Sequence, residues 1–226
     1  HRNTSNNLRD FIKYILKISQ IKLNKIIYLD EGFYLFKNCK IPSFLNLEST
    51  IRFYNYIFPP KDNNKNYLYI SRRNAKWRKI INEVDFYSDF EKNGFEIIDF
   101  ENLPVIEQIK KMQTCKKVIA PHGSGLVNLI FAAPKTSAIE ILQKNISKDL
   151  INVYLKYKKI TLNKKINHHL FEADLVDNDL KDYLDFRNLS EAQHIGKNIL
   201  INSQYFKNFI VKESEFRKLI SNFAKK

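Results

Sequence analysis

Short apolar runs alternate with helix-like segments between residues 67 and 142, and this alternation constrains the fold more than any other feature. Short apolar runs are typical of buried strands, and apolar residues three and four positions apart are typical of helices. Strands are expected at 67–71, 95–100, 117–120 and 137–142, with helices at 77–93, 104–115 and 125–133 between them. Because a parallel strand pair needs a long crossover, this pattern predicts βαβ units and an α/β fold with a Rossmann-like, open parallel sheet.

The rest of the chain is less regular. Further helices are expected at 8–18, 48–58, 148–157 and 213–223, with a short strand at 26–29. The polar stretch at 61–66 is the best linker candidate. It suggests a partial N-terminal region over residues 1–66 and a Rossmann-like domain with a C-terminal helical extension over residues 67–226. The basic cluster at 156–159 is expected to be a solvated helix face, with a membrane-surface patch as the alternative.

Composition excludes several classes of protein. The chain has 226 residues, 44% of them hydrophobic, which is enough for a core and unlike a disordered segment. It has no apolar run long enough to span a membrane and no recognisable leader. Two cysteines without CxxC spacing, Cys39 and Cys115, are expected to be buried, reduced thiols. The net charge of +14 favours anionic partners, namely nucleic acid, an anionic membrane surface or phosphorylated substrates.

Glycine is scarce in this chain, with 5 in all, yet Gly123 and Gly125 are two positions apart. They belong to the run from Pro121 to Leu126, which follows an expected strand and opens an expected helix. Glycine lets the backbone approach a ligand closely, and the amide groups of a helix start suit phosphate. The run matches neither the dinucleotide nor the P-loop signature. The alternative is a plain strand-to-helix turn in which His122 is a structural histidine.

Other polar side chains are expected at the same sheet edge, where open α/β sheets bind ligands. Ser71 and Arg72 end the first strand, and a guanidinium there could bind a diphosphate bidentately, although surface arginines are the alternative. Glu140 is the only charge in the strand at 137–142. It could hold ribose hydroxyls, by analogy with dinucleotide folds, or mark an edge strand.

Two motifs that could hold a metal ion are better explained otherwise. The Asp-Asn-Asp run at 177–179 matches a DxD pattern, but it stands among helix-start signals that favour a capping role. His168 and His169 have no second ligand pair at a suitable spacing. The sequence therefore predicts no metal site.

Taken in order, these segments resemble glycosyltransferase family 61. The resemblance rests on YISR at 69–72, RKIINE at 78–83, FEII at 95–98, EQI at 107–109, APHGSGLVN at 120–128 and AIEI at 138–141. Each run alone is weakly specific, but their order and spacing agree over about 75 residues. The family's usual HGAG reads HGSG here, which keeps both glycines.

The resemblance implies a GT-B fold, in which the C-terminal of two Rossmann-like domains holds most of the donor. Only about 66 residues precede the α/β unit, so we expect the N-terminal domain to be reduced or to lie outside this chain. The implied reaction is an inverting transfer of a sugar from a nucleotide-sugar donor to a glycan acceptor. A UDP sugar is the first candidate donor, and no essential metal or other cofactor is implied. Bacterial capsule or other surface polysaccharide synthesis is implied, in the cytoplasm or at the inner face of the membrane.

Carried over by position, the residues implied in donor binding are Ser71, Arg72, Gly123, Ser124, Gly125 and Glu140. Arg78, Asn82 and Glu83 also match the family's motif, with less clear roles and a solvated helix face as the alternative for Glu83. His122 is the candidate catalytic base or phosphate ligand. Two other hypotheses stay open: a basic nucleotide- or nucleic-acid-binding module without catalysis, and a family-61-like domain that has lost catalysis.

Overall fold

The computed structural model describes residues 6–22, 25–29, 33–35, 37–38, 46–61, 64–75, 78–144, 148–176 and 207–225. In this part of the chain a six-stranded sheet has the order β2-β1-β3-β4-β5-β6. Its strands are β1 (Asn66–Ile70), β2 (Phe95–Ile98), β3 (Cys115–Pro121), β4 (Ser137–Gln143), β5 (Asn167–Val176) and β6 (Asn208–Ile210). The strands from β2 to β5 pair in parallel, and β6 runs antiparallel to β5. This α/β architecture is compatible with the expected Rossmann-like fold.

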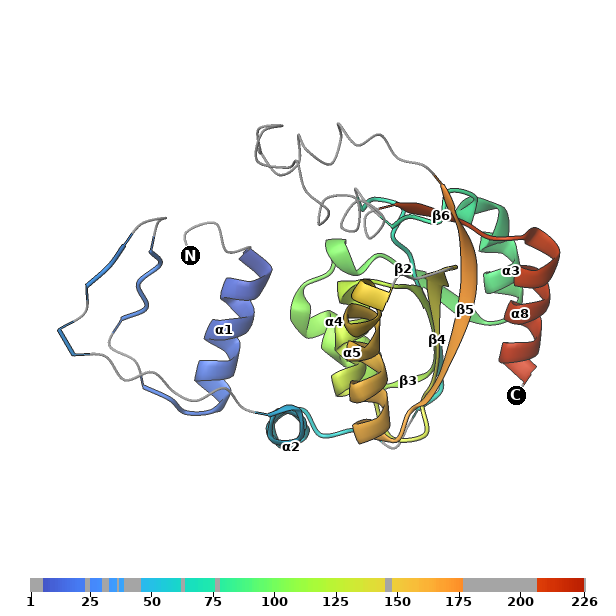
Figure 1. Cartoon of the computed structure of the whole chain (residues 1–226). Helices are drawn as coiled ribbons and strands as arrows, with labels where there is room; N and C mark the ends of the chain where they lie inside the picture. Colours follow the sequence, from blue (N-terminus) through green and yellow to red (C-terminus); the bar gives the residue numbers. More distant parts are fainter. Residues whose placement is uncertain are drawn as a thin grey trace, which may run out of the picture.

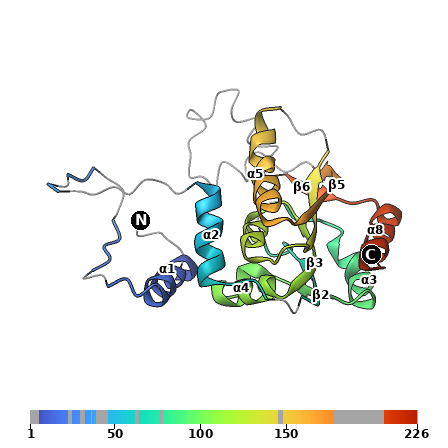
Figure 2. The same cartoon turned by 90° about the horizontal axis from the view of Figure 1, so that it is seen from below.

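Helices cover both faces of the sheet, as Figure 1 and Figure 2 show. One side carries α1 (Asn6–Ile18), α2 (Leu47–Ile57), α4 (Val105–Gln113), α5 (Lys148–Lys164) and the 3₁₀ helix η3 (Ser124–Phe131). The other side carries α3 (Tyr87–Lys92) and α8 (Glu213–Lys225). Successive side chains of a strand point to opposite faces. Leu68 and Ile70 of β1 accordingly join the core under the first group, whereas Tyr69 joins the core under the second.

The strand order creates a topological switch point between β1 and β3. The chain leaves β1 to form β2 on one side and then crosses over to form β3 on the other. The first crossover uses α3 and the second uses α4, which lie on opposite faces of the sheet. Loops that diverge in this way leave a crevice outside the carboxyl ends of the strands, which is where open α/β sheets bind ligands.

The helix expected at 77–93 is wrong in its first half. Residues 78–82 run beside β6: the Phe209 amide donates to the Lys79 carbonyl at 2.7 Å, and the Ile81 amide donates to the Phe209 carbonyl at 2.9 Å. Only the short 3₁₀ helix η1 (Glu83–Phe86) and α3 are helical. The cause is a partner more than a hundred positions away, which local periodicity cannot reveal.

Several other expectations can be compared with the structure. The segment 25–29 forms no strand, and Ile27 is 66% exposed. The sequence pattern did not predict β5, because its side chains are mostly half-buried or exposed and only Ala173 is buried. Cys115 is a buried free thiol, as expected, whereas Cys39 and the run at 177–179 lie outside the described residues.

The helix α2 packs directly against the α/β unit. Its Ile51, with Phe58 at its end, is buried in the same core cluster as Leu68 of β1. From α5, the buried Lys164 ammonium donates to the Asn55 side-chain carbonyl at 2.6 Å. The division of the chain at residue 66 remains a prediction, but the core under α2 is continuous with that of the sheet.

We expect Lys164→Met to stabilise the protein at pH 7. Burial lowers the pKa of Lys164 from 10.5 to about 8, so the unfolded chain binds this proton more tightly than the folded chain. Stability therefore rises with pH from about 8 to 10.5, and the burial cost is fully present below pH 8. The shift corresponds to about 3 kcal/mol, less about 1 kcal/mol for the lost hydrogen bond, which leaves a gain of about 2 kcal/mol.

Urea unfolding at pH 7 and pH 10 measures this gain, which is expected to shrink at the higher pH. Lys158→Met is the matched control, because Lys158 lies on the same helix with an exposed side chain. A Lys164→Met protein that is less stable than the parent at pH 7 would contradict the prediction.

Candidate active site

A cavity of about 550 Å³ lies at the carboxyl ends of β1 and β3, at the switch point. This volume is within the range of about 300–1,000 Å³ that is typical of ligand pockets. Apolar side chains line much of its wall, and α1 closes one side: Leu8, Phe11, Ile70, Phe100, Val105 and Val127. Its polar residues are Ser71, Arg72, Glu101, Gln108, Ser124 and Asn128. The sequence-predicted Ser71, Arg72, Ser124 and Gly125 all border this cavity.

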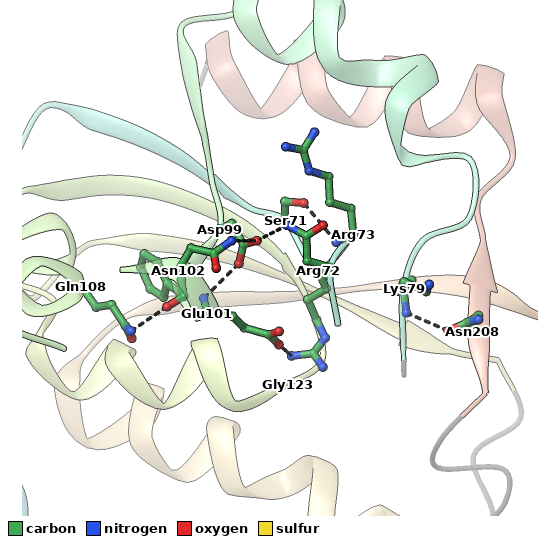
Figure 3. Close-up of polar contacts among 12 residues, drawn as sticks. Ser71, Arg72, Arg73, Lys79, Asp99, Glu101, Asn102, Gln108, Gly123 and Asn208 are labelled. Atoms are coloured by element: carbon green, nitrogen blue, oxygen red, sulfur yellow. Dashed lines mark hydrogen bonds and ion pairs between the residues drawn. The ribbon is translucent and has the colours of Figure 1, made fainter. Parts of the chain in front are cut away.

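Arg72 brings a positive charge to the gap between the two strand ends. Its guanidinium Nη1 lies 3.7 Å from Glu101 Oε1, and its side chain is only 11% exposed. In Figure 3 the Arg72 side chain points toward Gly123 and Glu101, whereas the side chain of Arg73 points the opposite way. A guanidinium that is loosely paired with a carboxylate at the edge of a cavity can exchange that carboxylate for an anionic ligand.

The two glycines of the HGSG run make close approaches possible. A Cβ atom on Gly123 would lie 2.6 Å from Arg72 Nη1, so any larger residue would displace the guanidinium. A Cβ atom on Gly125 would lie 3.2 Å from the Ile70 side chain, which is a tight contact with the core. The backbone of Gly123 is extended, with φ 172°, so its conformation needs no glycine. Glycine is therefore needed at position 123 to leave space for the Arg72 side chain, and not to form a tight turn.

Behind Gly123, Glu140 lies buried between two histidines. Its carboxylate Oε1 is hydrogen-bonded to His122 Nδ1, and Oε2 lies 2.9 Å from His168 Nε2. The three residues come from the end of β3, from β4 and from β5, and each side chain is at most 8% exposed. The structure thus places Glu140 away from the cavity wall that holds Arg72.

Burial and hydrogen bonding set the charges in this group. Burial alone would raise the pKa of Glu140, but the hydrogen bond with His122 and the close contact with the His168 ring hold it below its usual range. Burial lowers the pKa of His122, and repulsion from Arg78 and Arg72 adds to this effect against the pull of Glu140. Glu140 is therefore an anion at neutral pH and His122 a neutral ring. The neutral ring donates its Nδ1 proton to the carboxylate and keeps Nε2 as its acceptor atom.

Tyr157 of α5 completes this corner and was missed by the sequence reasoning. Its hydroxyl donates to the Gly123 carbonyl at 2.7 Å, and its ring centroid lies 5.0 Å from that of His122. The basic cluster at 156–159 was interpreted as a solvated face, and Lys158 and Lys159 are indeed exposed. The buried Ile160, three positions after Tyr157, is the helical-spacing signal that could have found it.

A second buried carboxyl group, Glu83, supports the end of β1 from the opposite face. It is 2% exposed and accepts hydrogen bonds from Tyr69 at 2.6 Å, Ser71 at 3.0 Å and Tyr87 at 3.2 Å. The solvated helix face considered for Glu83 is therefore wrong, because three hydroxyls surround its carboxyl group. The Ser71 hydroxyl is engaged in this network, although the residue borders the cavity.

Asn82 and Arg78 belong to the segment beside β6. The Asn82 amide group donates to the Val211 carbonyl at 2.9 Å and accepts from the Val211 amide at 3.2 Å, so it fastens this segment to the C-terminal part. Arg78 has a φ of 59°, a conformation that non-glycine residues seldom adopt, and its charge acts on His122. The structure thus brings Arg72, Gly123, His122 and Glu140 together, with Arg78 in electrostatic reach.

No group of three His, Cys, Asp or Glu side chains in the part of the chain that the structure describes is placed to hold a metal ion. None of its helices is both long enough and apolar enough to cross a bilayer.

Comparison with known proteins assigns the chain to a family. The model of the family Glycosyltransferase 61 matches residues 1–139, which include α1, α2 and the strands from β1 to β3. No curated protein matches the chain. The matched segment contains the switch point, the cavity-lining Arg72 and the HGSG run. Because it covers more than half of the 226 residues, the chain belongs to the glycosyltransferase 61 family.

Proposed function

We propose that this protein is an inverting glycosyltransferase that moves a sugar from a nucleotide-sugar donor to a glycan acceptor. The observation that carries the proposal is the Arg72 guanidinium, packed on the Gly123 backbone at the edge of a cavity large enough for a ligand. The cavity lies at the topological switch point of the sheet, and α/β sheets bind nucleotides at such points. Membership of the glycosyltransferase 61 family supports sugar transfer as the reaction.

In this proposal the cations of the site stabilise the leaving group. When the bond between the anomeric carbon and the diphosphate oxygen breaks, the electron pair leaves with the nucleoside diphosphate. We propose that Arg72 binds that charge bidentately and that Arg78 adds a second positive charge near His122; the position of Arg72 near the cavity and the effect of Arg78 on His122 support this. Fixed cations that meet a developing negative charge stabilise the transition state without reorganisation, and here they would act in place of a divalent metal.

His122 is the proposed catalytic base. Its Nε2 atom takes the proton from an acceptor hydroxyl, and the hydroxyl oxygen attacks the anomeric carbon from the side opposite the diphosphate, which inverts the configuration. A neutral ring whose Nδ1 proton is given to Glu140 presents only an acceptor at Nε2. This favours a base over a phosphate ligand, because a phosphate oxygen needs a donor. The ring is 1% exposed, so the proposal requires a local opening that lets the acceptor hydroxyl reach Nε2.

The proposal extends to substrates and cellular context. A UDP sugar is the first candidate donor, with no cofactor, and a growing glycan is the acceptor. We place the reaction in the synthesis of a bacterial capsule or other surface polysaccharide, in the cytoplasm or at the inner face of the membrane. The net charge of +14 supports contact with an anionic membrane surface. We expect no nucleic-acid partner.

Thermal unfolding with added nucleotides tests the proposal. We expect UDP, or another nucleoside diphosphate, to raise the melting temperature in the presence of EDTA as well as with Mg²⁺. At a concentration of about 100 times Kd the gain is about 2.7 kcal/mol, which corresponds to about 5–10 °C for a chain of this size. Uridine is the matched control, because it carries the base and ribose without the phosphates that Arg72 would bind.

Two results would contradict the proposal. One is an unchanged melting temperature with every nucleoside diphosphate and nucleotide sugar. The other is a strongly salt-dependent affinity for DNA or RNA together with indifference to nucleotides, which is the behaviour of a nucleic-acid-binding module.

A further inference from the structure

One carboxylate joins two imidazole rings across three neighbouring strands. Glu140 of β4 reaches His122 at the end of β3 on one side and His168 of β5 on the other. The pairing register explains why: Glu140 lies beside Ala120, two residues before His122, and His168 lies beside Ala138, two residues before Glu140. All of these positions alternate onto the same face of the sheet.

The two contacts place one imidazole nitrogen beside each carboxylate oxygen. A fully buried carboxylate is costly unless its oxygens are paired, and Glu140 is 0% exposed. His122 Nδ1 is hydrogen-bonded to Oε1, and His168 Nε2 lies 2.9 Å from Oε2. On its far side, His168 Nδ1 lies 3.4 Å from the buried Thr161 hydroxyl of α5, which orients the ring. His168 is therefore placed to stabilise the anionic form of Glu140.

The charge of Glu140 decides which nitrogen of His122 carries the proton. An anionic Glu140 can only accept, so His122 keeps its proton on Nδ1 and presents Nε2 as an acceptor. A protonated Glu140 would itself donate to Nδ1 and would move the ring proton to Nε2, where a base needs a lone pair. Among the described groups near His122, the cations Arg72 and Arg78 and the Tyr157 ring do not accept the Nδ1 proton in place of Glu140.

We propose that His168 is a positioning residue of the transfer reaction, which acts through Glu140 to hold His122 in the tautomer that can accept a proton at Nε2. This inference rests on the proposed function for the role of His122 as base. The coupling between the two rings is a property of the protein alone, and it is measured without substrate. The proposed function and this inference can therefore fail separately.

The experiment is NMR spectroscopy of the full chain labelled with ¹⁵N at its 5 histidines, in the wild-type protein and in His168→Phe. Phenylalanine keeps an aromatic ring at the position but offers no donor to Glu140. We expect His122 to carry its proton on Nδ1 in the wild type and to show a large population protonated on Nε2 in the variant. The His122 signals are assigned by their loss in His122→Asn.

Two further variants separate positioning from general disturbance. His168→Gln offers an amide donor to Glu140 and is expected to retain much of the wild-type tautomer. His169→Phe is the matched control, because His169 is the adjacent histidine, is exposed and points to the opposite side of the strand. If His168→Phe does not fold, His168→Leu replaces it, with the same expected change.

Activity provides the second arm. We expect His168→Phe to lower kcat at least about tenfold with little change in KM for the donor, since general-base catalysis supplies about 10²- to 10⁴-fold. His168→Gln should recover most of kcat. The inference is overturned if His122 keeps its wild-type tautomer in His168→Phe, or if the tautomer changes while kcat does not. A wild-type protein that shows the Nδ1 tautomer but neither binds nor turns over any nucleotide sugar would overturn the proposed function instead.

Discussion

Arg72→Ala is expected to lower the turnover of the nucleotide-sugar donor by about 10²- to 10³-fold, which is the usual cost of removing one preorganised group that stabilises developing charge. The guanidinium is held against Gly123 and 3.7 Å from Glu101, so it is oriented before a donor binds. Alanine leaves the diphosphate without its proposed bidentate partner. Steady-state kinetics with UDP sugars and a glycan acceptor measure the effect, chiefly in kcat.

Arg73→Ala is the matched control for this change. Arg73 is the next residue, has the same charge, and is exposed with its side chain pointing away from Gly123 (Figure 3). Its loss should leave kcat within about twofold of the parent, because exposed charges contribute little at a distance. Arg72→Lys keeps the charge but loses the planar fork, and we expect an intermediate rate. Equal rates for Arg72→Ala and the parent would remove Arg72 from the site.

Glu83→Ala is expected to destabilise the fold by about 3 kcal/mol without any contact with substrate. Its carboxyl group accepts from the hydroxyls of Tyr69, Ser71 and Tyr87, of which the Tyr69 side chain is fully buried. Removing the shared acceptor leaves buried donors without a partner, at about 1–3 kcal/mol for each. Burial also raises the pKa of Tyr69, so this hydroxyl stays protonated and still needs an acceptor.

Guanidinium unfolding of Glu83→Ala measures the loss, with Glu91→Ala as its control. Glu91 lies on α3 with an exposed side chain, and exposed substitutions change stability by about 0.5 kcal/mol or less. If the two variants were equally stable, the Glu83 network would contribute nothing and the end of β1 would be held by other contacts. Reduced stability with normal kcat at low temperature is the expected combination.

The expected sheet is an example of what local pattern can determine. The strands predicted at 67–71, 95–100, 117–120 and 137–142 are present with small shifts of their ends, because buried strands need continuous apolar runs. Their order along the chain, with helices between them, also made the parallel direction predictable. The position of Arg72 and the HGSG run at one edge followed from these two facts, without any knowledge of contacts.

Two acidic residues have surroundings that the sequence did not predict, because their partners lie on other secondary-structure elements. Glu140 was interpreted as a ribose-binding residue or as the mark of an edge strand; in the structure its carboxylate lies between His122 and His168 on a central strand. Glu83 was a possible site residue with a solvated helix face as the alternative, yet its carboxyl group is buried and accepts hydrogen bonds from Tyr69 of β1 and from Ser71 just after it. In both cases a charge that looks exposed or functional in the sequence is buried because other elements supply hydrogen bonds.

The sequence by itself determined the α/β class, the parallel strands up to β4 and the edge of the sheet that carries the cavity, since these depend on short-range periodicity and chain order. Only the tertiary structure decided the lateral order of the strands, the pairing of 78–82 with β6 and the Glu140 bridge between two histidines. Those features depend on which strands become neighbours. That choice is made by packing and hydrogen bonding between segments tens to more than a hundred residues apart, and it leaves no local signature in the sequence.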